Sequence, residues 1–178
     1  MYDIYYKLIA ERLKTAFPEL QTVDLFTDQY YPDENGEVFI NAPSAFIDLG
    51  ERIRWEDTGT YTQEANIDLK VHLALDFTGD TSFYDPQSAD SLQLDAAVFQ
   101  YLQKLHQSLH GWQMKDQASS LTHSTKFTRI SSERESQFMA GSLQVWIVTY
   151  RARIFDNSLN PDHDRTEFTI PSLSVNRP

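Results

Sequence analysis

The sequence predicts an α+β fold, in which an antiparallel or mixed β-sheet with two long strands is packed by an N-terminal helix and a central helix. The first long strand is residues 64–77, where every odd position from Ala65 to Phe77 is apolar and the even positions are mostly polar. Successive side chains of a strand point to opposite faces, so this alternation predicts a strand about 45 Å long with one buried face. Such a strand belongs to an antiparallel sheet.

The second long strand is predicted over residues 143–154. Its centre is rich in β-branched and aromatic residues, from Val145 to Tyr150, and these residue types favour strands. Because the apolar residues fall on both faces at the centre, we expect this strand to lie inside the sheet and to be covered on both sides.

Two amphipathic stretches predict the helices. Residues 3–17 have apolar residues at three- and four-residue spacing, with Asp3 as a cap and Pro18 as the stop. Residues 90–110 predict the second helix, and Gly111 stands where a helix C-cap belongs. We expect its buried stripe to consist of Leu92, Ala96, Phe99, Leu102, Leu105 and Leu109.

Shorter elements are predicted between these four. Strands are expected over residues 22–26, 37–40, 43–49 and 126–135. Residues 51–63 are read as a wide hairpin with 57–59 near its tip. Loops or turns are expected over residues 28–36, 78–91, 113–125 and 137–142, which are polar or contain Gly and Pro.

Composition narrows the class of protein. The formal net charge of -11 argues against general affinity for nucleic acid or anionic membranes, which need clustered Lys and Arg. There is no cysteine, so disulfides and thiol catalysis are excluded, and neither a signal peptide nor a membrane span is expected. We expect one domain over residues 1–155 and an extended C-terminal arm over 156–178, in a soluble protein whose partners are proteins or small molecules.

Few residues point to chemistry. His106 and His110 share the spacing of a zinc-protease pair, but position 107 is Gln where the general base would be Glu, and no third ligand follows. The acidic residues 156–164 lack the Gly and the spacing of a calcium loop. No nucleophile elbow or phosphate loop occurs. We therefore expect no metal and no cofactor.

The sequence supports contacts with other proteins better than it supports catalysis or metal binding. Arg and Trp are the residue types that anchor interfaces, and residues 51–56 alternate charge with bulk. The candidate partner-binding residues are Arg52, Arg54 and Trp55 on the predicted hairpin and Arg134 in the charged patch of residues 133–135. The alternative for Trp55 is that it packs on its own sheet.

The order of these elements resembles one protein family. A helix and a short strand are followed by the strand Pro43–Leu49, a hairpin, the long strand Ile67–Phe77, a helix ending in Leu109-His110-Gly111, and a closing strand pair within 127–154. This pattern resembles the tail terminator, or tail-completion, proteins of long-tailed bacteriophages over residues 1–155. The tail after residue 155 and the loop 28–36 depart from it.

The resemblance implies a structural protein of a phage or prophage tail, and not an enzyme. Such a subunit assembles into a ring, usually a hexamer, that caps the tail tube and docks to the head connector. Its partners would be further copies of itself, the tail tube protein and the head–tail connector protein. It would work in the host cytoplasm during assembly and then in the virion tail. The alternatives are a small cytoplasmic enzyme or ligand-binding domain, and an adaptor that binds one protein without forming a ring.

Overall fold

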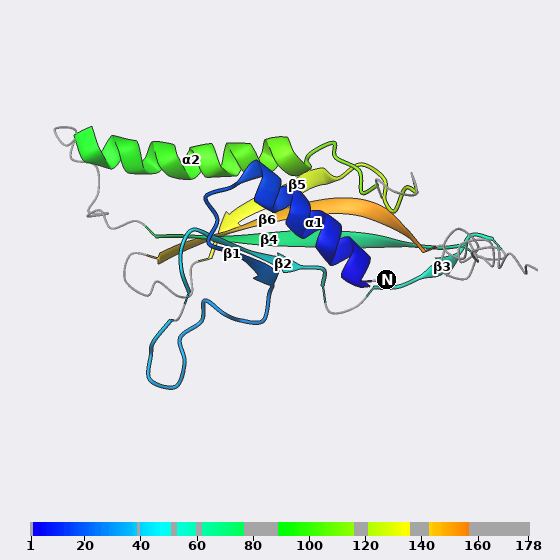
Figure 1. Ribbon diagram of the computed structural model, residues 1–178, viewed down its shortest axis with the longest axis horizontal. Coiled ribbons are helices and arrows are strands. Elements are labelled where there is room, and N and C mark those ends of the chain that lie inside the picture. Colours follow the sequence, from blue (N-terminus) through cyan, green and yellow to red (C-terminus); the bar gives the residue numbers. More distant parts are fainter. Residues whose placement is uncertain are drawn as a thin grey trace, which may run out of the picture.

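The computed structural model describes residues 2–38, 40–50, 53–59, 62–76, 89–115, 121–135 and 143–156. Within them, two helices lie on one six-stranded sheet (Figure 1). The helices are α1 (Tyr2–Ala16) and α2 (Ala89–Leu109). The strands are β1 (Thr22–Leu25), β2 (Ser44–Asp48), β3 (Glu56–Asp57), β4 (Gln63–Asp76), β5 (Thr128–Arg134) and β6 (Leu143–Asp156).

The sheet is built around the two long strands. Its order is β1-β2-β4-β6-β5, and β3 also pairs with β4. β4 and β6 are antiparallel along their whole length, from Gln63 opposite Asp156 to Asp76 opposite Leu143. β1 and β2 are parallel, so the sheet is mixed. The predicted α+β class, the two long strands and the interior position of β6 are confirmed.

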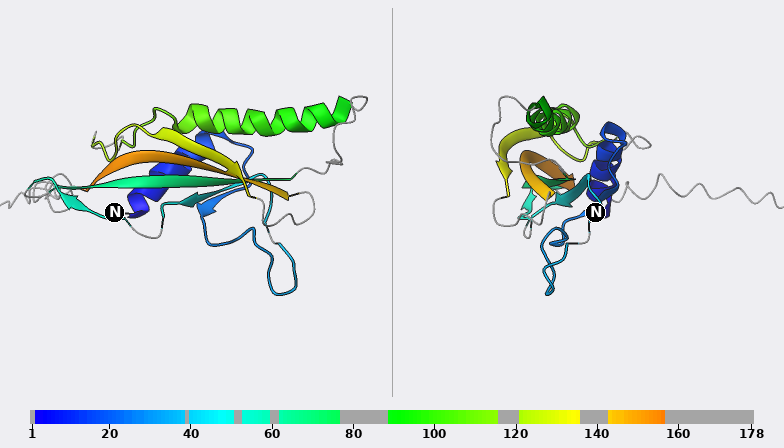
Figure 2. Two further views of the ribbon diagram at one scale, coloured as in Figure 1. Left: turned by 180° about the vertical axis from the view of Figure 1, so that it is seen from behind. Right: turned by 90° about the vertical axis from the view of Figure 1, so that its left-hand side faces the viewer.

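Both helices cover the same face of the sheet, as the end-on view in Figure 2 shows. The odd positions of β4 from Ala65 to Leu75 are all buried in this core. The partners on the helices include Ile9 and Leu13 of α1 and Leu105 of α2. The alternation of residues 65–75 is therefore the burial pattern of β4, because one set of side chains lies under the helices.

A second, smaller core lies on the opposite face of the sheet. Its buried members are Tyr30, Phe46, Ala74 and Val145. Phe26 and Tyr31 pack against it, so the segment that follows β1 covers one end of this face. This cover explains why Ala74 interrupts the polar set of β4, and why apolar residues occupy both faces of β6.

The predicted buried stripe of α2 is wrong at Phe99, whose side chain is 63% exposed. The neighbouring Val98 is buried in its place, together with Leu105 and Leu109. Val98, Leu105 and Leu109 lie on the side of α2 that packs into the main core, where the Tyr101 ring also stacks on Phe17, and Phe99 points away from this side. The side chains of Leu92 and Ala96 lie outside the described residues.

Two further predictions are corrected, and others fall outside the description. Residues 37, 38 and 40 form no strand, and residues 113–125 are more than a polar loop. Met114, His123 and Ser124 are buried, because this segment lies beside the end of β6 and Ser124 bridges to Ile154. The turn at 137–142, most of the loop at 78–91 and the arm after Asp156 lie outside the described residues.

Candidate functional site

The hairpin that carries the predicted partner-binding residues is formed by β3 and β4. Glu56 pairs with Glu64 and Asp57 with Gln63. The Thr58 amide donates to the Thr62 carbonyl at 3.0 Å, so residues 57–59 lie near the tip, as predicted. β2 pairs with the same edge of β4 further along, over residues 70–74. Between these two pairings, residues 65–69 of β4 have no paired strand on that side among the described residues.

A hollow lies at this gap in the sheet. One part, of about 620 Å³, is lined by Leu49, Gly50, Ile53, Asn66, Ile67, Asp68, Lys70 and Arg151. A second part, of about 340 Å³, is lined by Arg54, Glu56, Glu64, Ala65, Asn66 and Arg153. We call the two together the edge trough, because both include Asn66 and both follow the gap between β2 and β3.

Ion pairs cross the floor of the edge trough. The Arg151 guanidinium donates to both oxygens of Asp68, at 2.8 and 2.9 Å, and this hydrogen bonding lowers the pKa of Asp68. Arg153 lies 3.2 Å from Glu64. Arg54 is exposed at the rim, and no ion pair joins it to another described residue. Arg54 is therefore the cation of the edge trough that a partner can reach, whereas Arg151 and Arg153 are paired with carboxylates of β4.

The predicted residues do not form one site. Arg54 is exposed, whereas Trp55 is half-buried and packs against the main core. Arg134 lies on β5, the edge strand on the opposite side of the sheet. It pairs with Trp146 of β6, which in turn pairs with Leu73 of β4. Since β3 pairs at Glu64, nine residues away along β4, roughly 30 Å separates Arg134 from the hairpin. Arg52 lies outside the described residues.

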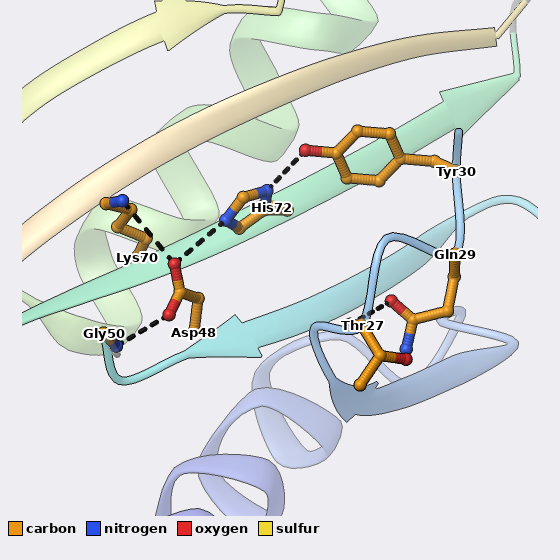
Figure 3. A network of polar contacts seen from close by, with 7 residues as sticks. All are labelled: Thr27, Gln29, Tyr30, Asp48, Gly50, Lys70 and His72. Atoms are coloured by element: carbon orange, nitrogen blue, oxygen red, sulfur yellow. Dashed lines mark hydrogen bonds and ion pairs between the residues drawn. The ribbon is translucent and has the colours of Figure 1, made fainter. Parts of the chain in front are cut away.

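Sequence reasoning missed a buried polar group on the second core. His72 of β4 is only 4% exposed, and its Nδ1 lies 2.7 Å from the Tyr30 hydroxyl (Figure 3). Its Nε2 lies 3.8 Å from Oδ2 of Asp48, which also lies 3.5 Å from the Lys70 ammonium. The other oxygen of Asp48 accepts from the Gly50 amide at 2.6 Å. The sequence pattern did not mark His72, because it stands at one of the polar positions of β4, where the alternation predicts exposure.

The surroundings of His72 keep it neutral. Burial lowers its pKa to about 4, although the nearby Asp48 carboxylate opposes this shift. Phe26 stacks on the imidazole with ring centroids 4.1 Å apart. We assign the proton to Nε2, facing Asp48, so that Nδ1 accepts from the Tyr30 hydroxyl. Burial also raises the pKa of Tyr30, which therefore remains a donor at neutral pH.

This arrangement suits anchoring better than catalysis. The order Tyr30, His72, Asp48 is that of a proton relay. However, Tyr30 is 2% exposed and His72 lies beneath Phe26, so neither meets a substrate on the surface. The contact holds the segment after β1 against the sheet, where the amide of Thr27 also donates to the Gln29 side chain at 2.7 Å.

His106 and His110 lie together near β5. Their ring centroids are 4.5 Å apart, and Nδ1 of His110 accepts from the Arg129 amide at 3.4 Å. Burial lowers the pKa of His106. Within the described ranges, no group of three or more His, Asp or Glu side chains is arranged to hold a metal ion.

Comparison with known proteins gives a distant likeness among the solved structures. No family model matches the chain, and no curated protein matches it. Among solved structures, a chain of the virion of a native gene transfer agent particle is similar at 13% sequence identity, with a TM-score of 0.42. The likeness covers 86% of this chain and 92% of that chain. A TM-score this low does not establish a common fold. In the part of the chain that the structure describes, neither helix is long and apolar enough to cross a membrane.

Proposed function

We propose that this chain is a structural protein of a phage or prophage tail, similar to tail terminators. In this proposal its subunits form a ring of six copies, the usual number in that family, on the end of the tail tube. The ring contacts the tube protein on one side and the head–tail connector on the other. Assembly takes place in the host cytoplasm, and the ring then remains in the virion tail.

The observation that carries this proposal is the order of elements. The resemblance rested on a helix, a strand at 43–49, a hairpin, a long strand, a helix ending at Gly111 and two closing strands. The fold has α1, β2, the β3–β4 hairpin, α2, β5 and β6 in that order. Gly111 has a φ of +74°, as a helix C-cap requires. The helices and strands on which the resemblance depends are therefore present in the fold, in the same order along the chain.

The sheet edges also suit a subunit of an assembly. Among the described strands, β5 pairs only with β6 and β1 pairs only with β2. All seven residues of β5 are exposed. Open edges are a hazard in an isolated protein, but a neighbour in a closed ring can cover them.

The hairpin at the edge trough is the proposed contact with the tube or the connector. Figure 1 shows β3 near one end of β4. Arg54 precedes β3 in the sequence and lines the edge trough. An exposed Arg beside a hollow can form a bidentate pair with a partner's carboxylate. We assign Arg52 to the same contact as its sequence neighbour, and Arg134 to a separate one on β5.

The test is assembly with the tail tube. The chain is produced together with the tube protein of the same phage or prophage, and the products are examined by light scattering and electron microscopy. We expect closed rings at one end of each tube, and tails made without the chain should not join heads. Tubes with bare ends in the presence of the chain, or normal particle yield in its absence, would rule the proposal out.

A further inference from the structure

Three basic side chains gather between α2 and the edge strand β5. Arg129 of β5 pairs with Tyr150 of β6, and the side chains of paired residues lie on the same face of a sheet. Because Tyr150 is buried in the main core beneath the helices, Arg129 is on the helix-covered face. His110 of α2 accepts from the Arg129 amide at 3.4 Å, and the His106 ring lies 4.5 Å from the His110 ring. We call Arg129, His106 and His110 the Arg–His cluster.

The Arg–His cluster has no acceptor of its own. Among the described residues, no carboxylate forms an ion pair with any of its three members. Nδ1 of His106 and the hydroxyl of Tyr150 are buried without a hydrogen-bond partner in the same part of the chain.

The charge of Arg129 acts on both of these buried groups. Burial lowers the pKa of His106, and the nearby guanidinium lowers it further. The same charge opposes the rise that burial causes in the pKa of Tyr150. An exposed guanidinium close to unsatisfied polar atoms suits a carboxylate, which accepts hydrogen bonds and carries the opposite charge.

The chain presents a carboxylate-bearing turn on the other side of the sheet. No Lys or Arg occurs between Lys14 and Arg52. Within this stretch, the connection from β1 to β2 projects from the sheet on the side away from α2 (Figures 1 and 2). The turn 33–37 in this connection carries three exposed acidic side chains, which are Asp33, Glu34 and Glu37. It is therefore a compact acidic surface that faces away from its own Arg–His cluster.

Hydrogen bonds within the turn fix its shape. The Asp33 carboxylate accepts from the amides of Asn35 and Glu37, at 2.8 and 2.9 Å. The Gly36 amide donates to the Asp33 carbonyl at 2.9 Å, and Gly36 has a φ of +80°, which glycine adopts without strain. No ion pair joins Glu34 to another described residue. A turn ordered in advance loses little conformational entropy on binding, and Glu34 is the carboxylate it offers.

We propose that the turn 33–37 of one copy docks on the Arg–His cluster of a second copy, where the Glu34 carboxylate pairs with Arg129. This inference rests on the proposed function and deepens it, because it names a contact between neighbouring subunits of the ring. The turn and the cluster lie on opposite sides of the sheet, so each copy uses them toward two different neighbours. Such a head-to-tail contact generates a ring when its rotation closes.

Opposite charge selects this contact in a chain that otherwise repels its copies. The formal net charge is -11, so most surfaces of two copies are alike in sign. An Arg–carboxylate pair can form two parallel hydrogen bonds, which orient the partners as well as attract them. Charge complementarity also favours the correct pair of surfaces during the encounter.

Disulfide cross-linking tests the contact, because the chain has no cysteine of its own. One full-length variant carries Asn35→Cys, which keeps the Asn35 amide, and a second, enlarged by a tag, carries Gln107→Cys on α2 beside the histidines. After mixing and oxidation we expect mixed dimers on a non-reducing gel, since a disulfide needs Cα atoms within about 7 Å. Asn66→Cys, an exposed position in the edge trough, replaces Gln107→Cys in the control and should give little product.

A charge exchange separates specific docking from chance collision. Glu34→Arg added to the Asn35→Cys variant should lower the yield of mixed dimers about fivefold. Arg129→Glu added to the Gln107→Cys variant should restore it, whereas Lys126→Glu, which reverses another exposed cation, should not. A yield no higher than the Asn66→Cys control, a yield that ignores the reversal of Glu34, or rescue by Lys126→Glu would each overturn the proposal.

The outcome is separable from that of the proposed function. A disulfide traps even a brief contact between two copies, so the cross-link does not require a stable ring or a tail tube. Rings on tubes without the mixed dimers would leave the proposed function standing and remove this contact. Charge-dependent mixed dimers without rings on tubes would do the reverse.

Discussion

The Tyr30 hydroxyl lies 2.7 Å from Nδ1 of His72, joining a loop to the central strand across 42 positions of the sequence. The loop segment would otherwise have little to hold it, because it follows the four-residue edge strand β1. The aromatic ring of Phe26 covers the imidazole, and Asp48 faces its other nitrogen. The Tyr30–His72 contact is therefore one of the interactions that hold the loop on the sheet, beside the packing of Phe26, and it depends on His72 being neutral.

Acid should weaken the protein through His72. Its pKa is about 4 in the folded state and about 6.5 when unfolded, so the unfolded state binds more protons between these values. Stability is complete above about pH 6.5 and falls as the pH drops toward 4, by about 3 kcal/mol in total. Asp48, Lys70, Glu135 and Tyr30 are the titratable groups around the ring. Chemical denaturation at pH 7, 6 and 5 measures the slope.

The matched variant for this prediction is His72→Gln, which removes the titration and keeps a polar group. It should be less stable than the wild type at pH 7 yet lose less stability between pH 6.5 and 5. An equal slope in both proteins would show that another group controls the acid response.

The helix-covered face of β4 should not tolerate a charge. Leu73 is fully buried, and Leu73→Asp places an unpaired carboxylate in the main core. We expect a loss of more than about 4 kcal/mol, enough to unfold a domain of ordinary stability. The control is Asn66→Asp, on the same strand but exposed on the other face, which should change stability by about 0.5 kcal/mol or less. Circular dichroism melts compare the two, and similar melting of both would mean that the face assignment is wrong.

The rotation of α2 can be tested by two alanine substitutions. Leu105→Ala removes a fully buried side chain and should cost about 2–5 kcal/mol. Phe99→Ala removes a larger side chain that is mostly exposed and should cost about 0.5 kcal/mol or less in the isolated protein. Urea denaturation of both variants gives the comparison. A larger loss of stability in Phe99→Ala than in Leu105→Ala would show that Phe99 belongs to the buried stripe of α2, as the sequence predicted.

Partner binding at the hairpin should depend on Arg54 rather than on Trp55. Arg54→Glu changes an exposed side chain, so the melting temperature should stay near that of the wild type while tail completion fails. Trp55→Ala should instead lower stability by about 1–3 kcal/mol, because the indole packs against the main core. Lys14→Glu, which reverses an exposed cation on α1 outside the edge trough, is the matched control and should complete tails normally. Full complementation by Arg54→Glu would remove this residue from the interface.

The surface pair Arg151–Asp68 should contribute little to stability despite its two short hydrogen bonds. Both side chains are about half exposed, and such pairs are usually worth about 1 kcal/mol or less. A double-mutant cycle with Arg151→Ala and Asp68→Ala at low and high salt measures the coupling. A coupling energy well above this range would indicate that the pair is shielded from water more than the exposure of its side chains suggests.

The main elements could be predicted because their signals are local. A period of two along residues 65–75 requires a strand, and three- to four-residue spacing in the segments that became α1 and α2 requires helices, wherever these segments lie. Gly111 and the hairpin tip at 57–59 followed from backbone preferences alone. These predictions did not depend on which faces of the helices and strands pack together, and they were enough to predict the α+β class.

The remaining features were decided by contacts between distant parts of the chain. Phe99 and Val98 are adjacent, and the packing of α2 against the main core buries Val98 and leaves Phe99 exposed. Arg54 and Arg134 looked equivalent in the sequence, but strand order places them on opposite edges of the sheet. His72 had no local signal, because its burial comes from Phe26 and Tyr30, which pack over it from the loop after β1. Periodicity along the chain thus determined the elements, whereas burial and proximity depend on the sum of interactions across the fold and only the tertiary structure decided them.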